Sequence, residues 1–282
     1  MTVRAVETRS SPVSVRMPGV ASAALRSELS DSHASATVVG SASHAVWLLL
    51  DGGGVVVVST RDATRLPNSV EVAADAEANV FGSIEHGSPA TVGIGQVMLD
   101  GLTIDAVRWW DPRPALPTLD RARIAESIVD LPSTVDGMPL DAIPATDSPA
   151  GLVAAASMLI GRGEGLTPEG DDYLAGVLSA LRLFGEAVGD RRLMQTLDAT
   201  SLEISSLARQ RTTTFSAALI DHALKGNVAL PAAAFLRAVA GRGDIRASHR
   251  DLLAVGHSSG PALAAGIVLG GRSVSSLTGG AR

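Results

Sequence analysis

Residues 161–176, GRGEGLTPEGDDYLAG, combine five glycines with two adjacent carboxylates. Asp171 and Asp172 follow the pair Thr167-Pro168 and lead into an apolar helical pattern. Glycine-rich backbone at a helix N-terminus can direct several N–H groups at an anion. A carboxylate beside it can accept a proton or bind a metal ion such as Mg²⁺. The stretch therefore predicts an anion site with Asp171 and Asp172 as catalytic residues or tentative metal ligands, in which Asp171 is the general base or metal ligand and Asp172 is its partner.

A helix starting near Thr167 must position these carboxylates. Thr167 is a suitable N-cap and Pro168 a suitable first residue. Helical spacing then puts Asp171 on the apolar face with Leu174, whereas Asp172 lies beside the small residue Gly176. An ordinary capped helix with a flexible entry loop is the alternative interpretation. It explains Thr167, Pro168 and one acidic residue, but neither the glycines nor an inward-facing aspartate.

On the functional interpretation the glycine-rich stretch binds the substrate. Its predicted binding residues are Gly161, Gly163, Gly165, Thr167 and Gly170. The known phosphate loops do not fit, because a Walker loop needs a lysine and the dinucleotide fingerprint follows a strand. Here the glycines follow a predicted helix.

Two later stretches have a similar character. Residues 209–216, RQRTTTFS, place hydroxyls and arginines where they could either line an anion site or bond to their own backbone. Residues 256–261, GHSSGP, predict a second glycine-bearing helix start, and an ordinary capped helix is the alternative. The binding residues predicted from the two stretches are Arg211, Thr212, Thr213, His257, Ser258, Ser259 and Gly260.

Residues 256–260 also match G-x-S-x-G, the pattern of a serine-hydrolase nucleophile at Ser258. The hydrolase order requires an acid and then a histidine after the serine. Residues 259–282 contain no Asp, Glu or His. A serine hydrolase is therefore disfavoured.

Composition excludes several classes of function. The formal net charge of −6 provides no basic field for nucleic acid or an anionic membrane. Without cysteine, disulfides, thiolate nucleophiles and cysteine metal sites are excluded. The N-terminal residues lack the apolar core of a signal peptide, and the apolar runs are too short to span a bilayer. We expect a cytoplasmic protein.

The chain is predicted to be α+β, with a small N-terminal antiparallel sheet or barrel followed by a mainly helical domain. Expected domains are a disordered N-terminus at 1–15, a β-rich domain at 16–118, a proline-rich linker region at 119–148 and a helical domain at 149–282. Strands are expected at 45–50, 55–59, 69–72, 96–99 and 102–110, with hairpin turns at Asp51–Gly54 and Asp100-Gly101. A short helix at 119–129 could interrupt the linker region.

The helical domain is expected to contain helices near 149–160, 168–184, 190–208 continuing toward 225, 231–240, 246–255 and 261–270. Glycine is expected just after several of these helices, as is usual at a helix C-terminus. The glycines concerned are Gly161, Gly185, Gly226 and Gly241.

The first stretch resembles the signature G-x-G-x-GLTPxGDDxLxG of the family catalogued as domain of unknown function 2877. Residues 211–226 and 255–270 resemble its second and third blocks, so the resemblance covers about residues 150–270. The third block departs from the family pattern at Pro261-Ala262, where a bulky residue and an aspartate are common. An acidic role at this position is therefore not supported.

The family includes an AllH-like subunit of oxamate carbamoyltransferase, which interconverts oxalurate plus phosphate with oxamate plus carbamoyl phosphate in allantoin nitrogen catabolism. The resemblance implies small anionic substrates and hetero-oligomeric partner subunits, one of them FdrA-like. Two hypotheses stay open. The chain is either a subunit contributing to carbamoyl transfer or a non-catalytic anion-binding or assembly subunit whose partner carries the chemistry.

Overall fold

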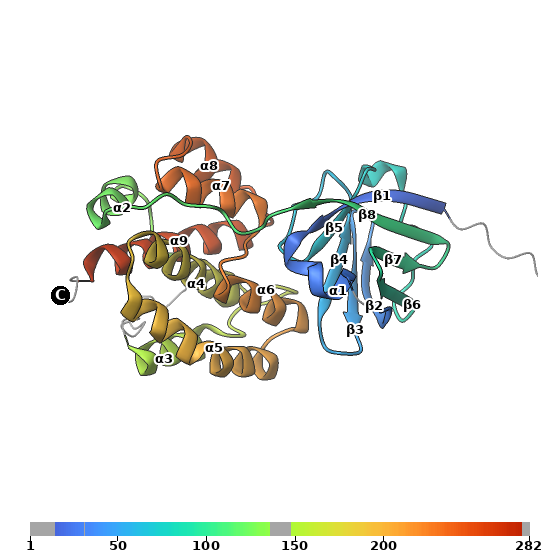
Figure 1. Cartoon of the computed structure of the whole chain (residues 1–282), viewed down its shortest axis with the longest axis horizontal. Helices are drawn as coiled ribbons and strands as arrows, with labels where there is room; N and C mark the ends of the chain where they lie inside the picture. The colour runs from blue at the N-terminus through green and yellow to red at the C-terminus, as the bar shows by residue number, and fades with distance from the viewer. Residues whose placement is uncertain (1–14, 31, 136–147, 278–282) are drawn as a thin grey trace, which may run out of the picture. The chain divides into compact units, whose positions relative to one another are not determined.

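The structure, a computed structural model, describes residues 15–30, 32–135 and 148–277. It consists of two compact units, formed mainly by residues before Trp110 and by residues from Trp110 on (Figure 1). The first is a β-barrel and the second is helical, which confirms the predicted α+β class. Except for Val15, the predicted disordered segment 1–15 lies outside the described residues, as do residues 136–147 of the predicted linker region.

The first unit is a closed barrel of eight strands in the order β1-β5-β4-β3-β2-β6-β7-β8. The strands are β1 (Val15–Ser22), β2 (Ala34–Ala42), β3 (Ala45–Leu50), β4 (Val55–Ser59), β5 (Ser69–Val72), β6 (Pro89–Gly93), β7 (Gln96–Leu99) and β8 (Leu102–Trp110), and a short helix α1 (Arg26–Ser30) follows β1. The five predicted strands occur at the predicted bounds. The sequence analysis did not delimit β1, β2 or β6.

Valine, leucine and isoleucine side chains fill the barrel. Along β3, for example, Val46 and Leu48 are fully buried, and they pair with Val58 and Val56 of β4. The two predicted hairpin turns are present, and Gly53 and Gly101 take the positive φ angles that such tight turns require. Closure leaves no free sheet edge in the barrel.

The second unit contains α2 (Arg121–Ile128), α3 (Pro149–Leu159), α4 (Glu169–Ala187), α5 (Arg191–Arg211), α6 (Thr214–Leu224), α7 (Leu230–Val239), α8 (Ile245–Leu253) and α9 (Ser259–Ser276). The central helix α4 is buried along most of its length and packs against α9, α6, α5 and α3 (Figure 1). Helix α2 lies in the predicted linker region, and its Ile124 and Ile128 are buried in the helical core. Among the described residues, no helix is both long and apolar enough to cross a membrane.

Several predicted helix ends were wrong. The helix expected to continue toward 225 ends at Arg211, and α6 starts after Thr213, whose side chain accepts a hydrogen bond from the Ser216 N–H and so caps it. Helix α4 has Pro168 rather than Thr167 at its N-cap. Helix α9 begins at Ser259, two residues before the predicted start.

The glycine expected to terminate α4 was also misplaced. Gly185 lies inside α4, where a side chain would overlap Leu193 and Met194. Gly189, with a φ of +71°, follows the helix instead. Tertiary packing therefore explains Gly185, and backbone conformation explains Gly189.

Glycines allow α4 and α9 to approach with their backbones almost in contact. A Cβ atom on Gly176 of α4 would overlap the Leu263 carbonyl oxygen of α9. A Cβ atom on Gly266 of α9 would overlap the Tyr173 carbonyl oxygen of α4. Neither obstacle is a flexible side chain, so a larger residue must push the helices apart.

We predict that Gly266→Ala destabilises the helical unit by about 1–3 kcal/mol, as overpacking of a close-packed contact usually does. Urea unfolding followed by circular dichroism measures the change. Gly54→Ala is a matched control, because a Cβ atom at Gly54 meets no atom within 4 Å. Equal stabilities for the two variants would contradict the close approach of α4 and α9.

Candidate functional site

The three glycine- and hydroxyl-bearing stretches meet at the N-terminus of α4. Asp171, in the first turn of α4, accepts a hydrogen bond from the Gly161 N–H at 2.8 Å. Its other carboxylate oxygen accepts hydrogen bonds from the hydroxyls of Thr212 and Ser216, the latter at 2.7 Å. The carboxylate therefore joins the turn after α3, the break between α5 and α6, and the start of α4.

The Asp171 side chain is almost fully buried, with a relative exposure of 1 %. A buried carboxylate is tolerated when donors satisfy it, and Asp171 has three donors from its own chain. Donors of the chain itself therefore contact both oxygens of the Asp171 carboxylate. The alternative that Thr212 and Ser216 bond back to their own helix does not hold, because both hydroxyls donate to Asp171.

Asp172 lies in a different environment. It is also buried, with 8 % relative exposure, but its Oδ2 atom has no hydrogen-bond partner among the described residues. Burial raises the pKa of the Asp172 carboxyl to about 7, and the charges of Asp171 and Glu169 add to the rise. Hydrogen bonds from the hydroxyls of Ser259 and Thr167 oppose it. Asp172 can therefore exchange a proton near neutral pH.

The hydroxyls beside Asp172 come from two helix starts. Thr167 precedes α4, Ser259 is the first residue of α9, and their Oγ atoms are 3.0 Å apart. The close contact of α4 with α9 brings the two helix N-termini together. Their aligned backbone dipoles favour a negative charge at this place.

The predicted glycine cradle is only partly available. The N–H groups of Gly161, Gly170 and Gly260 already donate to Asp171, to the Arg162 carbonyl and to the Val255 carbonyl, respectively. Gly170 and Gly260 are buried where a side chain would overlap neighbouring backbone. The contacts of these three glycines thus have a structural explanation.

Gly163 and Gly165 differ from those glycines. Both are exposed and have positive φ angles of +111° and +90°. Within the described part of the chain, their N–H groups have no hydrogen-bond acceptor. The loop that carries them is held in place by Thr213, whose hydroxyl donates to the Leu166 carbonyl at 2.6 Å. These two N–H groups are therefore available to an external anion.

The remaining predicted residues lie around this cluster with less direct contacts. Arg211 is tied to α3, because its guanidinium donates to the hydroxyl of Ser157 at 2.7 Å. Ser258 is the N-cap residue of α9, but its side chain makes no capping hydrogen bond. His257 is exposed in the turn before α9.

The residues fit a metal site poorly. The hydrogen bonds to Asp171 leave Asp172 as the one carboxylate of the pair with a free oxygen. Among residues 15–30, 32–135 and 148–277, no group of three or more His, Asp or Glu side chains could hold a metal ion. Mg²⁺ prefers several oxygen ligands at near-octahedral positions. The donor set thus gives no reason to route a reaction step through Mg²⁺.

Sequence reasoning missed two parts of the arrangement. It did not identify Ser216 as a partner of Asp171 or Ser157 as the partner of Arg211. The order RTTTFS gave a signal, because three threonines and a serine are unusual inside a helix. No sequence pattern indicated that the hydroxyls of Thr212 and Ser216 donate to Asp171, more than 40 positions earlier in the chain.

Comparison with known proteins agrees with the resemblance read from the sequence. Residues 159–271 match the family model described as oxamate carbamoyltransferase subunit AllH. The match begins at the last residue of α3 and ends within α9, so it spans the whole Asp171–Asp172 cluster. This confirms the AllH-like resemblance; the name domain of unknown function 2877 is not tested by it. No curated protein and no solved structure matched the chain.

We predict that Asp171→Asn lowers the free energy of unfolding by about 2–3 kcal/mol, because the amide nitrogen faces donors and leaves at least one of them unsatisfied. Chemical denaturation at neutral pH measures the loss. Asp172→Asn is the isosteric control, since its Oδ2 has no donor to lose. A loss in the control as large as in Asp171→Asn would show that the hydrogen bonds to Asp171 are not the cause.

A second prediction concerns pH. The folded-state pKa of Asp172, about 7, lies above the ordinary aspartate pKa of 3.8, so folding favours the protonated carboxyl. The contribution of protonated Asp172 to the stability of the fold is complete below about pH 4 and is lost as the pH rises through 7. Asp172→Asn should remove this dependence and be more stable than the wild type above pH 7, by roughly 4 kcal/mol at most. Carbon-13 NMR of labelled aspartate should show one carboxyl titrating near pH 7, absent in the variant. Titration of every aspartate below pH 5 would contradict it.

Proposed function

We propose that this chain is a subunit of a carbamoyltransferase-type enzyme that transfers a carbamoyl group between phosphate and the amide nitrogen of oxamate, in purine or allantoin nitrogen catabolism. The match of residues 159–271 to an oxamate carbamoyltransferase subunit supports the reaction class. The single observation that carries the assignment of the site is the buried Asp172 carboxyl, with an unpartnered oxygen and a pKa of about 7.

The reaction requires one proton to move at the attacking nitrogen. The oxamate amide nitrogen forms a bond to the carbamoyl carbon, and the bond from that carbon to the phosphate oxygen breaks. Phosphate leaves with the electron pair, and the nitrogen loses a proton, which the ionised Asp172 carboxylate accepts. In the reverse direction, protonated Asp172 returns that proton. A group whose pKa lies near the working pH can serve both directions.

Both substrates are small anions, and the segments around Asp172 carry hydrogen-bond donors. The N–H groups of Gly163 and Gly165 are free in the loop just before α4, and the N-termini of α4 and α9 meet through Thr167 and Ser259. Such preorganised donors stabilise negative charge that develops during transfer. In this proposal Asp171 is a positioning residue, because it fixes the loop and the helix starts around Asp172. The hydroxyls of Ser259 and Thr167 fix the orientation of the Asp172 carboxyl by hydrogen bonding.

A second candidate function is a non-catalytic subunit that binds the anion or supports assembly. The observation in its favour is that the cluster around Asp172 combines carboxylates and hydroxyls, whereas Arg211, the arginine expected there, is bonded to Ser157. A departing phosphate group is usually stabilised by positive groups. A partner subunit would then supply them. The catalytic role has the stronger support, because the free oxygen of Asp172 and its raised pKa suit it to accept and return a proton.

The test is turnover of carbamoyl phosphate and oxamate by the assembly purified with the full chain and its partner subunits. We predict that Asp172→Asn lowers kcat by about 100-fold or more, the usual contribution of a general acid–base group. The KM values should change little, and the inflection near pH 7 in the wild-type kcat profile should be lost. Oxalurate formation measured by chromatography provides the rates.

Asp251→Asn is the matched control, because Asp251 is exposed in the same unit and its ion pair with Arg250 is long, at 3.4 Å. It should retain wild-type rates. Near wild-type turnover in Asp172→Asn, with the assembly intact, would overturn the proton-transfer role and favour the non-catalytic subunit. Turnover by the isolated chain would show that no partner group is required.

A further inference from the structure

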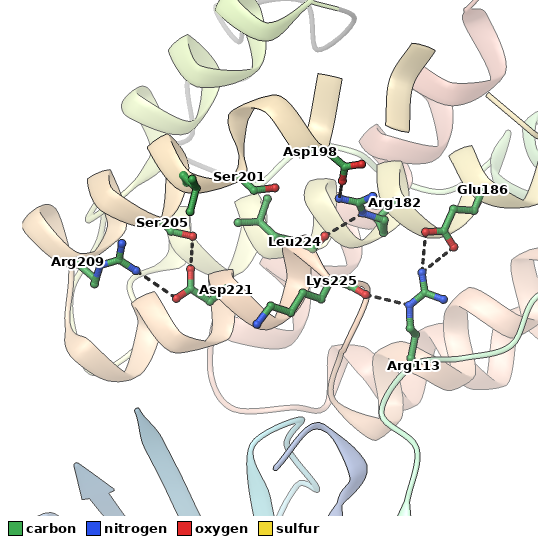
Figure 2. Close-up of a pocket in the computed structure, with 11 residues that line it drawn as sticks. Arg113, Arg182, Glu186, Asp198, Ser201, Ser205, Arg209, Asp221, Leu224 and Lys225 are labelled. Carbon is green, nitrogen blue, oxygen red and sulfur yellow. Dashed lines mark hydrogen bonds and ion pairs between the residues drawn. The ribbon is translucent and has the colours of Figure 1, made fainter. Parts of the chain in front are cut away.

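A second polar site lies on the helical unit, lined by residues outside the Asp171–Asp172 cluster. It is an open groove of about 510 Å³, lined mainly by residues of α4, α5 and α6 together with Arg113 (Figure 2). Four cationic and three acidic side chains line it: Arg113, Arg182, Arg209, Lys225, Glu186, Asp198 and Asp221. The sequence analysis predicted no site here.

Two of the arginines, Arg113 and Arg182, stabilise the end of α6. Arg113 donates to the Lys225 carbonyl at 2.9 Å and forms a two-bond ion pair with Glu186. Arg182 donates to the Leu224 carbonyl at 2.9 Å and pairs with Asp198 at 2.7 Å. The two guanidinium groups therefore satisfy carbonyls at the C-terminus of α6, where positive charge is favourable. Their charges are neutralised by Glu186 and Asp198.

The other two cationic side chains, Lys225 and Arg209, do not bond to the carbonyls at the end of α6. Lys225 is the only lysine of the sequence, is exposed, and forms no ion pair with any residue that the structure describes. Arg209 contacts Asp221 through Nη1 alone, at 3.5 Å, and Asp221 also accepts a hydrogen bond from Ser205. The remaining donors of the Arg209 guanidinium have no acceptor within the described residues. The groove thus carries one surplus positive charge beside a loosely held arginine.

Figure 2 shows the side chains of Lys225 and Arg209 on either side of Asp221, and both residues line the groove. An ammonium group is a compact point charge, whereas a guanidinium group presents donors in a planar fork. A tetrahedral oxyanion has enough oxygens for both kinds of donor. A carboxylate has two oxygens and one charge, and is the poorer match.

We propose that this groove binds a phosphate group through Lys225 and Arg209. The site is separate from Asp172 and does not depend on the proton-transfer role of that residue. Surplus positive charge in a concave surface concentrates anions, and the attraction grows with the charge of the ligand. A phosphate group of about −1.5 to −2 charge at neutral pH is therefore favoured over a singly charged anion.

The single lysine permits a test specific to this site. An uncharged amine-acylating reagent is allowed to react with the purified full chain, and the modification of Lys225 is followed by peptide mass spectrometry. The α-amino group of the chain serves as an internal reference. Inorganic phosphate at tens of millimolar should slow labelling of Lys225 by about threefold, as expected when its concentration is about twice the Kd. The reference amine should be unaffected.

Three variants test whether phosphate protects Lys225 by binding in the groove. Arg209→Gln should abolish the protection, whereas Arg192→Gln, at an exposed arginine of α5 outside the groove, should keep it. Asp172→Asn should also keep it, so failure of the proton-transfer role and failure of this proposal are distinguishable. Equal protection by acetate at the same ionic strength, or unchanged labelling with phosphate, would overturn the phosphate site. Circular dichroism checks that each variant is folded.

Discussion

The burial of the Asp171 carboxylate is the constraint on which the rest of the candidate site depends. A carboxylate with 1 % exposure is tolerated only when donors replace the water that it has lost. Its donors come from the turn after α3, from the break between α5 and α6 and from α6 itself. The three segments are therefore held at the start of α4. The close approach of Gly161 to the Arg211 carbonyl and the Thr213 bond to Leu166 then fix the glycine-rich loop.

The adjacent Asp172 shows how one residue of helical rotation changes the chemistry of a carboxyl. Asp171 has hydrogen-bond donors on both oxygens, whereas Asp172 has an oxygen without a partner and is buried next to another negative charge. Burial and like charge disfavour its ionised form, so its pKa moves to about 7. The two neighbouring carboxylates therefore have different environments, although they are adjacent in the chain.

The glycines of α4 and α9 contribute by bringing backbones together. Because Gly176 and Gly266 have no side chains, the two helices approach closely and Ser259 comes within hydrogen-bond distance of Thr167. The groove beside α6 is instead lined by charged side chains. Its arginines at the helix C-terminus are paired with carboxylates, and Lys225 adds a surplus positive charge. The helical unit therefore has two separate polar features: the cluster around Asp172, and a groove that four cationic side chains line.

The sequence by itself determined the α+β class, five strands at their bounds, most helices and the segments that form the cluster, because alternation, helical period and turn residues are local properties. It also indicated that Asp171 faces inward. Only the tertiary structure decided that α5 ends at Arg211, because Thr212 and Ser216 donate to a carboxylate more than 40 positions away. It also decided which glycines are needed for packing and which keep free N–H groups. Asp171 and Asp172 are indistinguishable as sequence letters, and their roles differ because burial and hydrogen bonding depend on segments distant in the chain.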